Sequence, residues 1–489
     1  MPSNRTARAI IGSAVTIGVV ADQLFRTPVW GINLPIAAIL LAAAATTIPA
    51  PGRRALWPWL ASVFFAAMWA VRDAESLLAM DLLAALSLAS LPLLQERSIQ
   101  LKAVELIDLV TAPLRTAWAI SAGTLGFASF ARTHLVTTGA SGPNQRARAI
   151  TVGVLLAVPL LLLFGALFAA ADPVFNHALS SVFFVDIGPL AAHTITAGLL
   201  AWATAGFLWT LAKPPRPAGS LLALPQIGGL QVLTPLVATV VLFAAFVGVQ
   251  ATSLFGGATF VETTTGLTYA EYARGGFFEL QFAAMLVLPM VYFAPAFAGP
   301  LDPAATARLR RVMGVQIGLT ALVLASALWR MGLYVNAYGL TEDRVNGIAF
   351  MIWIAMTLVV FALTVVRGQP RHAAFGSLVA AVVTLAALNL VNPHAMIARY
   401  NLANAGNREV DVANLSRLGG DAVPILVSQL SLLPADQRCT LTAKIRKRYL
   451  VSGADWRGWN LSRERAREAA RSLAPTEPCP VTAKGGGAP

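Results

Sequence analysis

Charged residues are scarce in this sequence. Of its 489 residues, 57% are hydrophobic and only 12% are charged, whereas about 25% are charged in an average soluble domain. The shortage excludes a large soluble helical protein, because such a protein needs a charged surface. Uncharged apolar runs of about 20 residues, the length that crosses a bilayer, recur through the first 390 residues. We therefore predict an all-α fold, a polytopic helical membrane protein whose main partner is the lipid bilayer.

Motifs for nucleotide binding, nucleophilic catalysis and metal binding are absent from the sequence. There is no P-loop, no GxSxG and no dinucleotide fingerprint. The five histidines do not cluster, and no HExxH or comparable ligand spacing occurs. We therefore expect no cofactor and no metal. The net charge of +13 does not indicate nucleic acid, because basic residues of membrane proteins collect in cytoplasmic loops and face anionic lipid.

Eleven apolar runs are predicted to cross the membrane. They are residues 9–21, 32–50, 55–71, 76–94, 150–171, 188–211, 230–250, 276–297, 312–335, 347–366 and 374–391. The first run follows Arg5 and Arg8, and it is either a span or a signal peptide cleaved after Ala21. Either choice leaves the other spans unchanged.

A cytoplasmic amphipathic segment is predicted near residues 95–148. Lys102, Glu105 and Asp108 are spaced by three, which places them on one face of a helix at the membrane surface. Residues 116–131 carry no charge but form a short stretch. We expect this stretch to be a re-entrant or in-plane piece rather than a span.

Basic residues are distributed unequally between the two sets of loops. One set, which includes the N-terminus, holds Arg5, Arg8, Arg53, Arg54, Arg97, Lys102, Arg115, Arg132, Arg146, Arg148, Lys213, Arg216, Arg308, Arg310, Arg311, Arg367 and Arg371. The other set holds only Arg26, Arg72, Arg274 and Arg344. Because Lys and Arg mark the cytoplasmic side, we predict a cytoplasmic N-terminus and, after eleven spans, an extracytoplasmic C-terminus.

The chain is thus expected to have two domains, a transmembrane domain over residues 1–391 and a small helical extracytoplasmic domain over residues 392–489. We expect the second domain to contact an extracytoplasmic protein partner. Its predicted helices, with the residues that open them, are 422–432 (Asp421), 437–450 (Pro434 and Asp436) and 463–473 (Ser462).

The only two cysteines of the chain, Cys439 and Cys479, both fall in this C-terminal part. Neither belongs to a metal-binding motif, and an extracytoplasmic domain of a bacterium meets an oxidising compartment. We predict a disulfide between them. It would close a loop of about 40 residues and stabilise the domain by up to about 4 kcal/mol in the chain-entropy model.

Polar residues near the outer ends of two spans form the candidate functional site. Glu279 lies just inside one span and Arg330 just before another span ends, so their depths match. An unpaired charge in lipid is costly, which favours a pair between them. The alternatives are a fixed salt bridge, snorkelling to the interface, and a gated or substrate-binding site. The other members of this predicted outer-facing site are Tyr334, Tyr338, Arg274 and Tyr272.

Other acids of the membrane domain have simpler explanations. Asp81 lies within an otherwise apolar span, where an acid is either functional or hydrogen-bonded to a neighbouring helix. Glu342 and Asp343 follow Thr341, and we expect them to complement a helix dipole after an N-cap. Asp22 marks the outer end of the first run.

Several motifs in this order resemble a known family. They are ADPVF (171–175), YARGGFFEL (272–280), YGLTEDR (338–344), NPHAMIARYNL (392–402), GGDAVPIL (419–426) and DWRGWNLSRERA (455–466). They resemble the bacterial membrane family catalogued as domain of unknown function 4173, a relative of the group numbered 4153. The resemblance implies a multi-pass bacterial inner-membrane protein and carries over no catalytic residue.

Two classes of function remain open at this point. The first is a non-enzymatic protein, either a transporter or a scaffold for envelope assembly or signalling with an outer-facing polar site. The second is a glycosyltransferase-like enzyme that acts on a lipid-linked substrate at the outer face, with Asp22 as the acid after the first span. The loop after Asp22 is short for such an active site, so the sequence favours the first class.

Overall fold

The computed structural model describes residues 3–48, 56–95, 106–130, 187–213, 226, 228–265, 277–405, 410–450 and 455–474. Every element in these residues is helical. The helices of the membrane part are α1 (Asn4–Leu24), α2 (Asn33–Thr47), α3 (Trp57–Met68), α4 (Glu75–Gln95), α5 (Leu106–Phe130), α8 (Ile187–Ala212), α9 (Gly229–Thr265), α11 (Phe277–Ala298), α12 (Pro303–Tyr338), α13 (Glu342–Leu363) and α14 (Ala373–Val391). The C-terminal helices are α15 (Pro393–Ala403), α16 (Val412–Arg417), α17 (Val423–Ser428), α18 (Ala435–Tyr449) and α19 (Leu461–Arg471).

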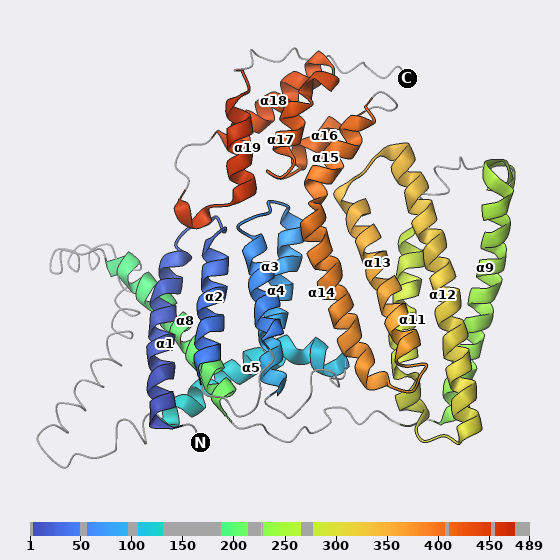
Figure 1. Ribbon diagram of the computed structural model, residues 1–489, viewed down its shortest axis with the longest axis horizontal. Coiled ribbons are helices and arrows are strands. Elements are labelled where there is room, and N and C mark those ends of the chain that lie inside the picture. The colour runs from blue at the N-terminus through green and yellow to red at the C-terminus, as the bar shows by residue number, and fades with distance from the viewer. Residues whose placement is uncertain are drawn as a thin grey trace, which may run out of the picture.

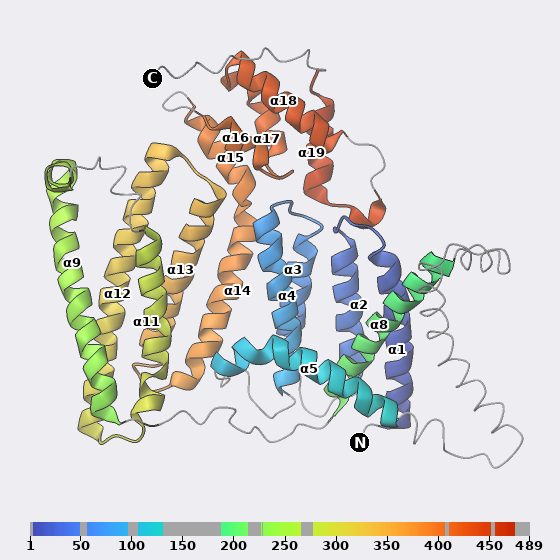
Figure 2. The same ribbon diagram turned by 180° about the vertical axis from the view of Figure 1, so that it is seen from behind.

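Upright helices stand side by side in two groups (Figures 1 and 2). In the first group α1 packs along α8, and α3 packs along α4. In the second group α12 packs against α9, α11 and α13, and α13 also packs against α14. Helix α14 joins the groups, because Phe375, Leu378 and Val382 pack against the buried apolar cluster that contains Phe65 and Leu88.

The prediction of a multi-pass helical membrane protein is confirmed, but the count of eleven spans is not. Within the described residues, eight helices are long and apolar enough to cross a membrane: α1, α4, α8, α9, α11, α12, α13 and α14. Helices α2 and α3 are apolar but have only 15 and 12 residues, fewer than the roughly 20 that a bilayer needs. The predicted span over residues 150–171 lies outside the described residues.

Helix α5 lies across the lower ends of the upright helices in Figure 2, and its position relative to the bilayer stays a prediction. It crosses α8 where two glycines meet, since a Cβ on Gly123 would lie 2.5 Å from the Gly206 carbonyl oxygen. Two hydroxyls bond across the crossing, Thr124 to the Trp202 carbonyl at 3.1 Å and Thr210 to the Ala119 carbonyl at 3.0 Å. Small residues with such hydroxyl bonds are a typical means of helix association in membranes.

The sharp junction between the membrane helices and the C-terminal helices depends on Asn392. Its backbone is left-handed, with φ of 58°, a conformation that asparagine tolerates better than most residues. It ends α14, and its side chain accepts a bond from the Ala395 amide at the start of α15. Pro393 follows at the first position of α15, where a missing N–H costs nothing.

The C-terminal helices gather at one end of the upright helices, and the chain's N-terminus lies at the other end (Figure 1). They do not form a separate apolar core. Ile397, Leu415 and Leu441 belong to one continuous cluster with Leu340 and Met351 of the membrane part. The C-terminal helices are therefore held by shared apolar packing as well as by polar contacts.

Two predicted helix starts in this region were wrong. Asp421 caps no helix, because α17 begins after Ala422, and the helix predicted over 422–432 is divided into α17 and a short 3-10 turn at Leu430–Leu432. Asn460, rather than Ser462, caps α19 and accepts the Arg463 amide at 3.0 Å. The side chains of Asp421 and Ser462 face the membrane part instead.

Candidate functional site

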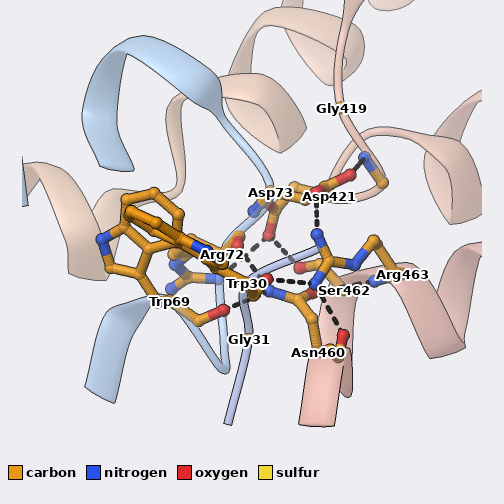
Figure 3. Close-up of polar contacts among 12 residues, drawn as sticks. Trp30, Gly31, Trp69, Arg72, Asp73, Gly419, Asp421, Asn460, Ser462 and Arg463 are labelled. Carbon is orange, nitrogen blue, oxygen red and sulfur yellow. Dashed lines mark hydrogen bonds and ion pairs between the residues drawn. The ribbon is translucent and has the colours of Figure 1, made fainter. Parts of the chain in front are cut away.

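The turn between α3 and α4, residues 69–74, is clasped by the C-terminal helices (Figure 3). The backbones are bonded directly, since the Leu461 amide donates to the Ala70 carbonyl at 2.8 Å. A second backbone bond joins the Ile32 amide, next to the start of α2, to the Trp459 carbonyl at 2.9 Å. We call the polar contacts around this turn, made by Arg72, Asp73, Asn392, Asp421, Asn460, Ser462 and Arg463, the polar clasp.

Asp421 is at the centre of the polar clasp. Its side chain is 1% exposed and lies 3.4 Å from the Arg72 guanidinium. It also accepts bonds from the Asp73 amide at 2.6 Å, the Asn392 side chain at 3.0 Å and the Ser462 hydroxyl. A buried carboxylate is stable only when it is paired and hydrogen-bonded, and these four donors meet that need.

Asp73 reaches in the opposite direction, from the turn to the C-terminal helices. One carboxylate oxygen accepts the Gly420 amide at 2.8 Å, and the other lies 3.4 Å from the Arg463 guanidinium. Arg463 also donates to the carbonyls of Trp30 at 2.7 Å and Gly458 at 2.8 Å. One arginine therefore links the loop between α1 and α2, the turn and α19.

Asn460 satisfies backbone carbonyls of the turn itself, and Ser462 lies beside it. The Asn460 amide group donates to the carbonyls of Trp69 at 2.8 Å and Arg72 at 2.7 Å. The Ser462 hydroxyl lies 2.8 Å from the Val71 carbonyl. The turn ends a helix and would otherwise leave carbonyls without partners, so the C-terminal segment completes it.

Close backbone contact at the clasp requires glycine. A Cβ on Gly419 would lie 1.7 Å from the Asp73 carbonyl oxygen, and one on Gly31 would lie 2.3 Å from the Trp459 carbonyl oxygen. Neither contact is possible for a real side chain, and the neighbouring atoms belong to the backbone. These two glycines set how closely the C-terminal helices approach the turn.

Burial governs the electrostatics of the clasp. Burial raises the pKa of Asp73, although the Gly420 amide and Arg463 act in the opposite direction. Burial likewise lowers the pKa of Arg463 against the effect of Asp73. The pKa of Tyr449, whose hydroxyl lies 3.5 Å from Asp73, is raised by burial and by that carboxylate. At Asp73 and Arg463, desolvation thus outweighs the effect of the ion pair.

A second polar line lies behind the clasp. The Ser76 hydroxyl donates to Glu342, and the other Glu342 oxygen lies 3.4 Å from Nε2 of His394. Nδ1 of His394 accepts the Gly419 amide at 2.8 Å, which fixes the proton of the neutral ring on Nε2. Serine therefore faces the carboxylate and not the imidazole, so this line is no nucleophile–base pair. Glu342 was predicted only to complement a helix dipole, and the structure gives it these two partners as well.

Four residues of the predicted outer-facing site lie in the described part of the chain. Glu279 is exposed in the first turn of α11 and Arg330 is half-buried on α12, and the pair between them stays a prediction. The rings of Tyr334 and Tyr338 meet edge-on, with their centroids 5.2 Å apart. The Arg344 guanidinium makes a cation–π contact with Tyr334, its carbon 3.9 Å from the ring centroid.

Three of the predicted residues lie outside the described part of the chain: Arg274, Tyr272 and Cys479. Cys439 lies on α18. The disulfide between Cys439 and Cys479 therefore stays a prediction.

Asp81 and Asp22 are both engaged. Asp81 is fully buried on α4 and accepts a bond from the Asn389 side chain of α14 at 2.7 Å. This bond corresponds to the hydrogen-bonded alternative for Asp81. Asp22 lies 2.9 Å from Arg26 and 3.1 Å from His193 of α8, with its side chain 6% exposed.

The acids at these sites all have polar partners. Donors lie beside the carboxylates of Asp421, Asp73 and Asp22, and Asp73 also lines a small pocket. No group of three or more potential metal ligands occurs in the described part of the chain. Sequence reasoning missed the clasp. Asp421, Asn460 and Ser462 lie in the GGD and NLS motifs, but nothing in these motifs indicates contact with the turn.

Comparison with known proteins identifies a family. No curated protein and no solved structure matches the chain. A family model described as Domain of unknown function (DUF4153) matches residues 59–429, a range that contains most of the membrane part and the turn and Asp421 of the clasp. The match is to the 4153 group, whereas the 4173 family that the motifs resemble is not shown. The chain therefore belongs to the family described as Domain of unknown function (DUF4153).

Proposed function

We propose that the protein is a non-enzymatic scaffold of the bacterial inner membrane, with a cytoplasmic N-terminus and an extracytoplasmic C-terminal domain that contacts a protein partner. The polar clasp carries this proposal. A scaffold that binds a partner must hold its exposed helices in a fixed orientation. The buried charged residues of the polar clasp hold the C-terminal helices against the turn between α3 and α4.

The distribution of charge supports the orientation. Arg5 and Arg8 on α1 and Arg308 and Arg310 on α12 lie at the end opposite the C-terminal helices. At the end next to those helices, Arg26 and Arg72 are paired with acids. The concentration of basic residues at the end opposite the C-terminal helices favours the cytoplasm for that end.

The geometry gives less support to an enzyme. A glycosyltransferase-like reaction would require Asp22 to face a substrate, but Asp22 is buried between Arg26 and His193. The C-terminal helices instead offer exposed aromatic side chains, Trp456 at 62% and Trp459 at 41% exposure. Exposed tryptophan is frequent both at interfaces with proteins and at the membrane surface.

Site-specific photo-crosslinking in living cells tests the scaffold. A benzophenone amino acid replaces the exposed residue Trp456 or Leu432, and Leu230, exposed on α9, serves as the control. A scaffold gives one reproducible protein adduct from a C-terminal position and none from the control. Absence of an adduct from both C-terminal positions would contradict the scaffold and favour the alternative of a transporter.

Reporter fusions test the orientation. A phosphatase that works only outside the cytoplasm should be active when it is fused after Pro489. Activity of a reporter that works only in the cytoplasm, fused at the same place, would contradict the orientation.

A further inference from the structure

A small charged pocket opens beside the polar clasp. It has a volume of about 240 Å³ and is lined by Asp73, Glu75, Arg448, Tyr449, Arg463 and Arg467. The lining comes from three places, namely the turn with the start of α4, the end of α18, and α19. Pockets that enclose drug-sized ligands measure about 300–1,000 Å³, so this one suits a single small group.

The lining has more positive than negative charge. Three guanidinium groups and two carboxylates line the pocket, which gives the lining a net charge of +1. Asp73 is already occupied by the Gly420 amide and Arg463. Arg463 and Arg467 both line the pocket and are four positions apart on α19, so their like charges repel each other.

Two of the arginines have donors to spare. Arg448 donates to the Leu418 carbonyl at 3.3 Å, and Arg467 donates to Glu464 at 3.0 Å, each through one terminal nitrogen. The other guanidinium nitrogens of Arg448 and Arg467 make no hydrogen bond to a described residue. A planar guanidinium with paired N–H donors matches the oxygens of a phosphate.

We infer that this pocket binds a phosphate group between Arg448 and Arg467. The bound dianion or monoanion would offset the repulsion among the three arginines and would use their remaining donors. The pocket lies between the turn before α4 and the helices α18 and α19. These helices stand at one end of the membrane helices (Figure 1), where we expect lipid headgroups. Two sources therefore supply the same chemistry, a phospholipid headgroup and free inorganic phosphate.

Binding to the purified full-length protein tests the inference. One arm titrates inorganic phosphate against chloride at matched ionic strength, and the other titrates short-chain phosphatidylglycerol below its micelle concentration. The variant Arg448→Gln/Arg467→Gln should bind at least tenfold more weakly, a change of about 1.4 kcal/mol. The control Lys447→Gln/Arg465→Gln removes the same charge from exposed positions of the same two helices that do not line the pocket, and should bind as the wild type does.

The sign of the ligand charge has its own test. Glu75 is exposed and lines the pocket, so Glu75→Gln should tighten phosphate binding without affecting the fold. Binding in the lipid arm alone assigns a headgroup, and binding in both arms assigns free phosphate. The inference is overturned if the wild type binds neither probe, if the two double variants bind equally, or if Glu75→Gln weakens binding.

Discussion

Replacing Asp421 with asparagine should release the C-terminal helices from the membrane helices. Asp421 accepts from four donors and has a side chain that is 1% exposed. Asparagine offers one acceptor oxygen, and its NH₂ group would face the donors that now bond the second oxygen. The substitution also leaves Arg72, whose side chain is 17% exposed, without its carboxylate.

The expected cost follows from this geometry. Removing one partner of a buried ion pair costs about 3–5 kcal/mol. Arg72 keeps its bond to the Asn389 carbonyl at 2.8 Å, so we expect the lower end, about 3 kcal/mol. This corresponds to a more than hundredfold increase in the population with the clasp open.

Trypsin sensitivity and thermal unfolding in detergent measure this effect. The basic helices α18 and α19 should be cut much faster in Asp421→Asn than in the wild type. Asp436→Asn is the control, because Asp436 lies in the first turn of α18 outside the clasp and should cost less than about 1 kcal/mol. If Asp421→Asn is as stable and as resistant as Asp436→Asn, the clasp does not hold the C-terminal helices.

Three further results are expected. Gly206→Ala should lower the melting temperature, because the added Cβ would lie 2.1 Å from a backbone oxygen of α5. Gly198→Ala on the same helix is the control: its Cβ meets no atom within 4 Å, so the substitution should be neutral or stabilising. Burial raises the pKa of Asp73 above its ordinary 3.8, so protonation of this carboxyl favours the folded state. The stability gained from protonation is present below pH 3.8 and is lost as the pH rises through the raised pKa. The melting temperature of Asp73→Asn should not fall over this pH range. If Glu279 and Arg330 pair in the bilayer, Glu279→Gln and Arg330→Gln should each lower the folded yield. Exchange of the two residues should restore part of this yield. Single variants with the folded yield of the wild type would exclude a pair that stabilises the fold.

Hydropathy predicted the membrane helices well because it depends on local composition. Long apolar runs must form helices in lipid, where every backbone group needs an internal partner. The same reasoning predicts a re-entrant or in-plane piece within α5, since its uncharged part is short. Whether α2 and α3 cross the membrane was harder to predict, because an apolar run in the sequence does not show how many of its residues form the helix.

The clasp could not be predicted, because its contacts join distant parts of the chain. Asp421 bonds to the Asp73 amide across 348 positions, whereas capping rules consider only the next few residues. An acid before a helix can cap that helix or reach another segment, and the sequence pattern is the same in both cases. Only the fold decides between them.

The pairing of Glu279 and Arg330 stays a prediction for a related reason. Matching depths in two spans fix the height of each charge but not its direction around the helix axis. Packing of α11 and α12 sets that direction, and Glu279 is exposed on α11. Tyr334, which follows Arg330 on α12, meets Arg344 from the start of α13.

Hydrogen exchange at the amides of the clasp tests the central claim most directly, namely that the C-terminal helices are fixed to the membrane helices. Four amides donate across the contact, those of Ile32, Asp73, Gly420 and Leu461. Amides that open in one cooperative unit exchange together, so these four should exchange slowly and at a common rate in the wild type, and much faster in Asp421→Asn. Fast exchange of the four amides in the wild type, while amides inside α12 stay protected, would contradict the claim.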